Sequence, residues 1–137
     1  MAWDFTGVNW VAVVVAAVVG LIIGFAWFAP QLFGKQWARE AGVQLGSAST
    51  TPPTTYVWAV VSVLLTAYVL AFLAHALGLK SVVDGAILGA IVWLGFVGPW
   101  TLASVTFEKK SWMYFYLTGG QGLVSLLVMG AILGAMG

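Results

Sequence analysis

The sequence contains no cysteine and very little charge, and each of these absences excludes a class of protein. Without cysteine there is no disulfide, no thiolate metal site and no cysteine nucleophile. Only 7% of the 137 residues are charged, whereas soluble domains carry about a quarter, so an ordinary water-soluble globule is excluded. Hydrophobic residues make up 62% of the chain, which excludes intrinsic disorder. The composition therefore predicts a protein whose solvent is the lipid bilayer.

The shortage of charge also argues against nucleic-acid binding and catalysis. The formal net charge is +1, which provides no basic field for a nucleic-acid partner. The one histidine and the four carboxylates form no evident pair of nucleophile and base, and the sequence has no phosphate loop or dinucleotide motif. We therefore expect a protein that is not an enzyme, has no catalytic residue and holds no metal.

Four apolar runs are each long enough to cross about 30 Å of hydrocarbon as a helix. They lie near residues 8–29, 56–78, 82–107 and 112–136. The charged residues lie between these runs or at their edges: Asp4, Lys35, Arg39, Glu40, Lys80, Asp84, Glu108, Lys109 and Lys110. Transmembrane strands would require alternating polar and apolar residues, which these runs do not have. The pattern predicts an all-α fold, a single four-transmembrane-helix bundle over residues 1–137.

The first loop, about residues 30–55, divides into two parts. Residues 30–42 predict a short interfacial helix opened by Pro30. Its lipid-facing residues are expected to be Leu32, Phe33 and Trp37, and its water-facing residues Lys35, Gln36, Arg39 and Glu40. The remainder is rich in Ser, Thr and Pro and predicts a flexible loop.

Basic residues are distributed unevenly between the two sides of the predicted bundle. The loops after the first and third runs contain Lys35, Arg39, Lys109 and Lys110, whereas the opposite side contains only Lys80. The positive-inside rule then places those two loops in the cytoplasm and both termini outside. We expect the protein to lie in the inner (cytoplasmic) membrane as a multi-pass protein.

A weak internal repeat relates the two halves of the chain. The order Gly-Phe, Pro, Phe-x-Lys, Trp occurs once after the first run and again near the end of the third. The first copy is Gly24-Phe25, Pro30, Phe33-Gly34-Lys35 and Trp37, and the second is Gly95-Phe96, Pro99, Phe107-Glu108-Lys109 and Trp112. Two interpretations are open: two repeated helical hairpins, or coincidence in a very apolar chain.

The segment Trp27-Phe28-Ala29-Pro30-Gln31-Leu32-Phe33-Gly34-Lys35-Gln36-Trp37 resembles the signature of DUF1761, a bacterial and archaeal membrane-protein family of unknown function. The likeness extends to the four-helix plan, to Phe107-Glu108 at the end of the third run, and to the Gly130 to Gly134 ending. The family usually has Tyr where Phe28 stands. It often has polar or histidine residues where this chain has Trp100, Thr101 and Gln121. The resemblance implies a fold and a location, and no activity.

Small residues recur on the predicted helices at the spacing that permits close helix packing in lipid. They are Ala12, Ala16, Gly20, Gly24, Gly85, Gly89, Gly122, Gly130 and Gly134. One interpretation is packing within a single bundle, and the other is a docking face for a second subunit.

A polar stripe follows one face of the fourth run, with a shorter one on the third. Its members are Tyr114, Thr118, Gln121 and Ser125, joined by Thr101, Ser104 and Glu108. Polar groups in lipid need partners or water. The stripe therefore predicts one of two arrangements. One is a cavity open to the cytoplasm, with Glu108 at its mouth, for an ion, proton or small polar ligand. The other is hydrogen bonding between helices, with Glu108 solvated beside Lys109 and Lys110.

The aromatic residues and the single histidine raise the question of a bound group. His75 shares a face with Tyr68 and Phe72, which suits either packing or ligation of haem or chlorophyll. The eight tryptophans suit either anchoring at the membrane surface or contact with a lipid or pigment. Pro99, inside the third run, is expected to kink that helix. No cofactor is required by the pattern.

The sequence as a whole favours a protein that acts by association. It is expected to be a homo-oligomer, or an accessory or structural subunit of a larger membrane complex, with membrane lipids and other membrane subunits as partners. Two alternatives stay open: a small oligomeric transporter or channel that uses the polar stripe, and a lipid- or pigment-binding protein.

Overall fold

The computed structural model describes residues 3–29, 32–41 and 53–137, and within these ranges the secondary structure is helical. The elements are α1 (Trp10–Trp27), α2 (Gly34–Ala41), α3 (Pro53–Ala76), α4 (Val82–Val92), the π-helical segment η2 (Trp93–Val97), α5 (Gly98–Phe107) and α6 (Trp112–Met136). Helices α1, α3 and α6 and the continuous Val82–Phe107 unit are each long and apolar enough to cross a membrane. The predicted all-α fold is confirmed, and the four spans indicate a multi-pass membrane protein.

The helix ends agree with the predicted spans at the third and fourth runs and differ at the first two. Helix α3 begins at Pro53, so residues 53–55 form its first turn instead of the end of a loop. Proline is well suited to a first helical turn, where its missing N–H has no partner to lose. Helix α2 begins at Gly34. The Pro30 start predicted for this helix lies outside the described residues, as does the predicted loop over 44–52.

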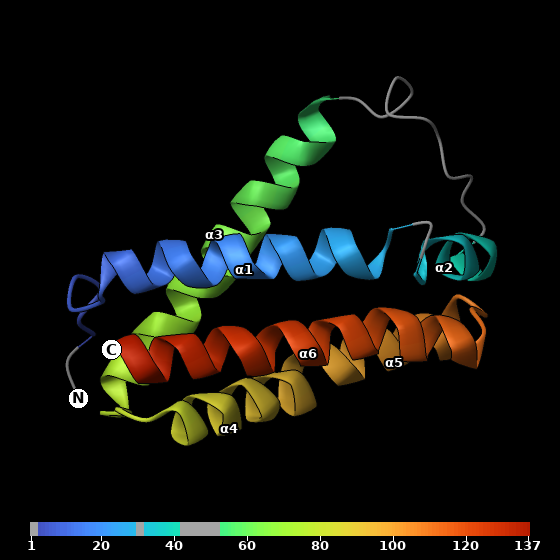
Figure 1. Cartoon of the computed structure of the whole chain (residues 1–137). Coiled ribbons are helices and arrows are strands. Elements are labelled where there is room, and N and C mark those ends of the chain that lie inside the picture. Colours follow the sequence, from blue (N-terminus) through green and yellow to red (C-terminus); the bar gives the residue numbers. More distant parts are fainter. Residues whose placement is uncertain (1–2, 30–31, 42–52) are drawn as a thin grey trace.

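Three of the spans lie alongside one another, and the fourth crosses them. Helix α6 lies between α1 on one side and the α4–α5 unit on the other, and α3 crosses α1 at a wide angle (Figure 1). Side-chain oxygens cap the starts of three helices: Asn9 accepts from the first turn of α1, Ser81 from that of α4, and Ser111 from that of α6. The core lies where α1, α3 and α6 meet, with Leu70 and Met129 almost fully enclosed.

Helices α4 and α6 are in direct backbone contact. A Cβ added to Gly85 would strike the carbonyl oxygen of Gly130, and one added to Gly130 would strike that of Gly85. Gly89 and Gly134 have the same relation to the carbonyls of Leu126 and Ser81. Glycines on both helices therefore allow the two backbones to touch, as in the small-residue packing common in membranes.

Helices α1 and α3 contact each other over only part of their length. The buried residues of α3 all come from its second half: Ala67, Leu70, Ala71, Phe72 and Ala74. They pack with the buried first half of α1, which includes Ala12 and Ala16. The first half of α3 stands away from the other helices (Figure 1). Gly20 of α1 still approaches Val63 of α3, whereas no atom of α3 lies within 4 Å of a Cβ added to Gly24.

Candidate functional site

A cavity of about 430 Å³ lies in the space where α3 diverges from α1 and α6. We call it the lateral groove, and its lining is Gly20, Leu21, Gly24, Phe25, Phe28, Ala59, Ser62, Val63, Thr66, Val97, Gln121, Gly122, Ser125, Leu126 and Met129. Its size falls within the range of roughly 300 to 1,000 Å³ typical of ligand pockets. The lining contains no charged residue, so the groove is an apolar cavity with a few neutral polar groups.

The most enclosed polar groups of the groove are Gln121 and Ser125, one turn apart on α6. The Gln121 side-chain N–H donates to the Ser125 hydroxyl oxygen at 2.8 Å, and Ser125 is only 9% exposed. Gln121 is nine residues into α6, which is about 14 Å along the helix and close to the middle of a bilayer core of roughly 30 Å. In a bilayer spanned by α6, the pair would therefore lie near the midplane.

The other members of the predicted polar stripe lie elsewhere. Thr101 and Ser104 donate to carbonyls of their own helix, at 2.8 Å and 3.5 Å respectively. Glu108 is exposed at the end of α5. Tyr114 lies beneath the Lys110 ammonium, 5.7 Å from its ring centre. The structure therefore brings Gln121 and Ser125 to the groove and leaves these four outside its lining.

Three tryptophan indoles converge on one turn of α6, and Thr118 of the stripe lies among them. Trp27 donates to the carbonyl of Leu117 at 3.0 Å, and Trp93 donates to that of Gly119 at 2.8 Å. Trp37 of α2 donates to the Thr118 hydroxyl at 3.1 Å. The sequence does not predict this arrangement, because the three tryptophans belong to three different elements and no spacing along the chain relates them.

The segment that carries Trp93 is the π-helical turn η2. The Gly98 N–H donates to the Trp93 carbonyl five residues earlier, one residue further than in an α-helix. Pro99 follows in the first turn of α5, where its missing N–H costs least. The irregularity expected at Pro99 thus takes the form of one widened turn that precedes it.

The small residues predicted for helix packing lie inside the bundle or along the groove. The four glycines of α4 and α6 make the backbone contact described above. Ala12 and Ala16 belong to the core, and Gly122 packs against the π-helical segment through Val97 and Trp93. Gly20 approaches Met129 and Val63, whereas Gly24 would meet only the Gln121 amide nitrogen, at 3.6 Å. Gly24 is therefore the most open of these positions.

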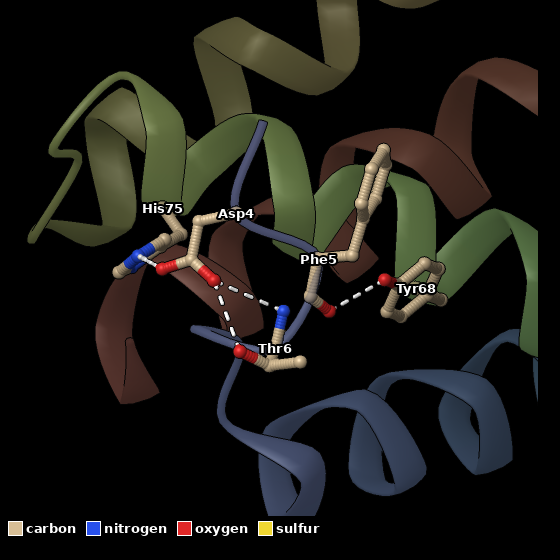
Figure 2. A network of polar contacts seen from close by, with 5 residues as sticks. All are labelled: Asp4, Phe5, Thr6, Tyr68 and His75. Atoms are coloured by element: carbon tan, nitrogen blue, oxygen red, sulfur yellow. Dashed lines mark hydrogen bonds and ion pairs between the residues drawn. The ribbon is translucent and has the colours of Figure 1, made fainter. Parts of the chain in front are cut away.

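His75 lies at the opposite end of the bundle, beside the chain segment that precedes α1. Figure 2 shows Asp4 between His75 and Thr6, and Tyr68 directed at the backbone of Phe5. The His75 and Asp4 side chains are 3.4 Å apart, and the Tyr68 hydroxyl donates to the Phe5 carbonyl at 2.6 Å. These contacts tie the preceding segment to α3. Within the described ranges, no three His, Cys, Asp or Glu side chains are grouped as a metal site.

The Asp4 carboxylate is stabilised by its neighbours. It accepts the backbone N–H and the hydroxyl of Thr6, each at 3.1 Å. The Thr6 backbone N–H, then its hydroxyl, and then His75 hold the pKa of the Asp4 carboxyl below its ordinary value.

A smaller cavity of about 230 Å³ lies nearby, and its polar lining includes Asn9 and Lys80. Both already donate to backbone carbonyls at the end of α6, those of Met136 and Gly137.

At the basic end of the bundle, α2 is fastened to the turn between α5 and α6. Lys110 donates to the Ala41 carbonyl at 2.8 Å, and the Ser111 hydroxyl donates to the Glu40 carboxylate. Ala38 of α2 is buried, while Lys35 and Arg39 of the same helix are exposed. Helix α2 therefore has one face docked on the bundle and one cationic face. The expectation that Trp37 faces lipid is wrong, because its indole donates to Thr118 of α6 and so lies toward the bundle.

Comparison with known proteins gives a family and no function. A family model described as "Protein of unknown function (DUF1761)" matches residues 11–134, which confirms the resemblance found in the Trp27–Trp37 segment. No curated protein and no solved structure matches the chain.

Proposed function

The chain belongs to the DUF1761 family, and we propose that it acts without catalysis, as a homo-oligomer assembled in the membrane through α3. The observation that carries the proposal is the departure of the first half of α3 from its own bundle. In lipid, helices gain stability from van der Waals packing and hydrogen bonds rather than from escape from water. Most side chains in this half are exposed and lack such packing within the subunit, apart from contacts such as that of Val63 with the core, and a second subunit would supply it.

The outward side of α3 has the pattern of a helix-packing seam. Trp58, Val61, Leu65 and Val69 follow one another at spacings of three, four and four residues and are 67%, 38%, 60% and 49% exposed. Helical periodicity places them on a side of α3 next to its groove-lining residues, about 100° around the helix axis from them. Apolar side chains at this spacing interdigitate between paired helices. We call these four residues the α3 seam.

A second copy of this chain is the partner that the seam fits best. The seam is apolar and uncharged, so it selects neither an acidic nor a basic partner. Its repeat is also self-complementary, as a twofold interface requires. An accessory role in a larger complex is the other form of the association hypothesis. It would be recognised by seam crosslinks to a different protein.

Site-directed crosslinking tests the proposal cleanly, because the native sequence contains no cysteine. Val61→Cys and Leu65→Cys are expected to form disulfide-linked dimers on mild oxidation in native membranes. Ile87→Cys on α4, which is 51% exposed, is the matched control and is expected to stay monomeric. A monomeric mass in lipid nanodiscs, together with no crosslink at any seam position, would overturn the assembly.

We also propose the inner membrane as the location, with the end formed by α2 and the α5–α6 turn in the cytoplasm. The supporting feature is the cationic group Lys35, Arg39, Lys109 and Lys110 at that end. Lys109→Cys is expected to react with an impermeant maleimide only after the cytoplasmic side is exposed, and Lys80→Cys to react from outside. Reversed labelling would reverse the orientation.

A further inference from the structure

The lateral groove carries an inference that goes beyond assembly. We infer that it binds a neutral, long-chain membrane lipid that has a hydroxyl or carbonyl group, with this group held by Gln121 and Ser125 and the chain lying against α1 and α3. The inference rests on four properties of the groove: its lining, its lack of charge, its depth and its opening.

The polar pair leaves hydrogen-bonding capacity for a ligand. A carboxamide has two N–H donors and one acceptor oxygen, and Gln121 uses one N–H on Ser125. The Gln121 oxygen is then an acceptor, and its second N–H and the Ser125 hydroxyl hydrogen are donors. A hydroxyl suits both kinds of group, and a carbonyl suits the donors.

The absence of charge decides the class of ligand. None of the groove-lining residues is charged, and the bilayer core around it has a low dielectric constant. A carboxylate or phosphate placed against Gln121 would be buried without a cation, at a cost that two neutral donors do not offset. The ligand is therefore uncharged at its polar end.

The depth of the pair excludes ordinary phospholipid head groups. Gln121 is about 14 Å into α6, near the middle of the hydrocarbon core, whereas phospholipid head groups lie at the membrane surface. A polar group at this depth belongs to a molecule that resides largely within the hydrocarbon, such as a long-chain or isoprenoid alcohol or ketone.

The rim of the groove gives such a molecule access from the bilayer. Phe25 on α1 and Ser62 and Thr66 on α3 line the groove and are themselves exposed. The Thr66 hydroxyl donates to the carbonyl of Ser62, so Thr66 presents no unsatisfied hydroxyl donor to lipid. Helix α3 leaves α1 within the apolar length of both helices (Figure 1), and these rim residues lie on the two helices.

Photolabelling with an alcohol probe tests the inference. The full chain in phosphatidylcholine nanodiscs is exposed to a diazirine-bearing hexadecanol and illuminated, and the labelled peptides are identified. Labelling is expected to concentrate on groove residues of α1, α3 and α6. Excess hexadecanol is expected to compete at least tenfold better than either hexadecane or hexadecyl phosphate. Equal competition by all three, or labels spread evenly over the lipid-facing surface, would overturn the inference.

Two variants separate the polar pair from the space of the groove. Gln121→Leu removes the hydrogen-bonding group and is expected to reduce labelling about tenfold, while labelling by a matching hydrocarbon probe is unchanged. Gly24→Leu fills the groove and is expected to abolish labelling by both probes. Added carbon at Gly24 meets only the Gln121 nitrogen at ordinary contact distance, so the helix tolerates the substitution.

Matched controls keep a folding defect distinct from a binding defect. Gly95→Leu adds the same side chain where no atom lies within 4 Å of the new Cβ, and Thr101→Val removes a polar group that bonds only to its own helix. Both are expected to retain wild-type labelling, and thermal unfolding is measured for every variant. The crosslinking of Leu65→Cys is independent of all of these, so the assembly and the ligand site can fail separately.

Discussion

The two helix pairs of this molecule, α4 with α6 and α1 with α3, use small residues in different ways. In the first pair, glycines on both helices bring the backbones into contact over two turns. In the second, alanines pack one end of the pair and nothing comparable continues along the other, where Gly20 and Gly24 face the groove. The difference indicates that close packing in lipid requires small residues on both partners along the whole contact.

The largest effect is expected from breaking the closely packed pair. Gly85→Leu would drive its side chain into the backbone of Gly130, which cannot move away without separating the helices. We expect the free energy of unfolding to fall by about 3 kcal/mol or more, as in severe overpacking. Denaturation in mixed detergent micelles measures this. Gly95→Leu, at an open position, should change it by less than about 0.5 kcal/mol. Equal effects of the two substitutions would contradict the backbone contact.

A second comparison lies within α3 itself. Leu70 is 2% exposed in the packed half, whereas Leu64 in the diverging half is 39% exposed. Leu70→Ala is expected to cost about 2–3 kcal/mol through the cavity that it leaves, and Leu64→Ala less than about 0.5 kcal/mol. The same denaturation assay measures both. Similar costs at the two positions would mean that α3 is packed along its whole length.

A smaller effect is expected from the two indole hydrogen bonds that join α1 and η2 to α6. Trp27→Phe and Trp93→Phe each remove one N–H donor to an α6 carbonyl while keeping an aromatic ring. We expect each to lower the free energy of unfolding by about 0.5–1.5 kcal/mol. Trp100→Phe, at a position 76% exposed, is the control and is expected to be neutral. A neutral result at both Trp27 and Trp93 would mean that the indole bonds do not contribute to stability.

The smallest effect concerns pH at the end where the segment before α1 meets α3. Because the pKa of the Asp4 carboxyl is lowered in the folded protein, its contribution is complete above the ordinary carboxyl pKa, about 4. The contribution is lost as the pH falls through the lowered value, and the Asp4 contacts with Thr6 and His75 then weaken. The amide chemical shift of Thr6 should follow this titration in NMR spectra. In Asp4→Asn it should not respond to pH in this range.

The sequence was sufficient to predict the four spans, because hydropathy and the positions of the charged residues report directly on contact with lipid. It also identified the family from the Trp27–Trp37 segment, which the match over residues 11–134 bears out. It did not predict the divergence of α3, since Val61 and Leu70 are equally apolar and only the three-dimensional contacts distinguish them. For the same reason, the periodicity that grouped Thr118 with Gln121 could not tell which of them borders a cavity.

The π-helical turn has a consequence for the whole of α5. It contains one residue more than an α-helical turn, as if a single residue had been inserted into a regular helix. At 3.6 residues per turn, one extra residue rotates everything that follows by about 100°. This rotation sets the present orientation of α5, with Val105 inward at 7% exposure and Trp100 outward. Deletion of Leu94 from the turn would restore regular helix and rotate that surface of the protein back by the same angle.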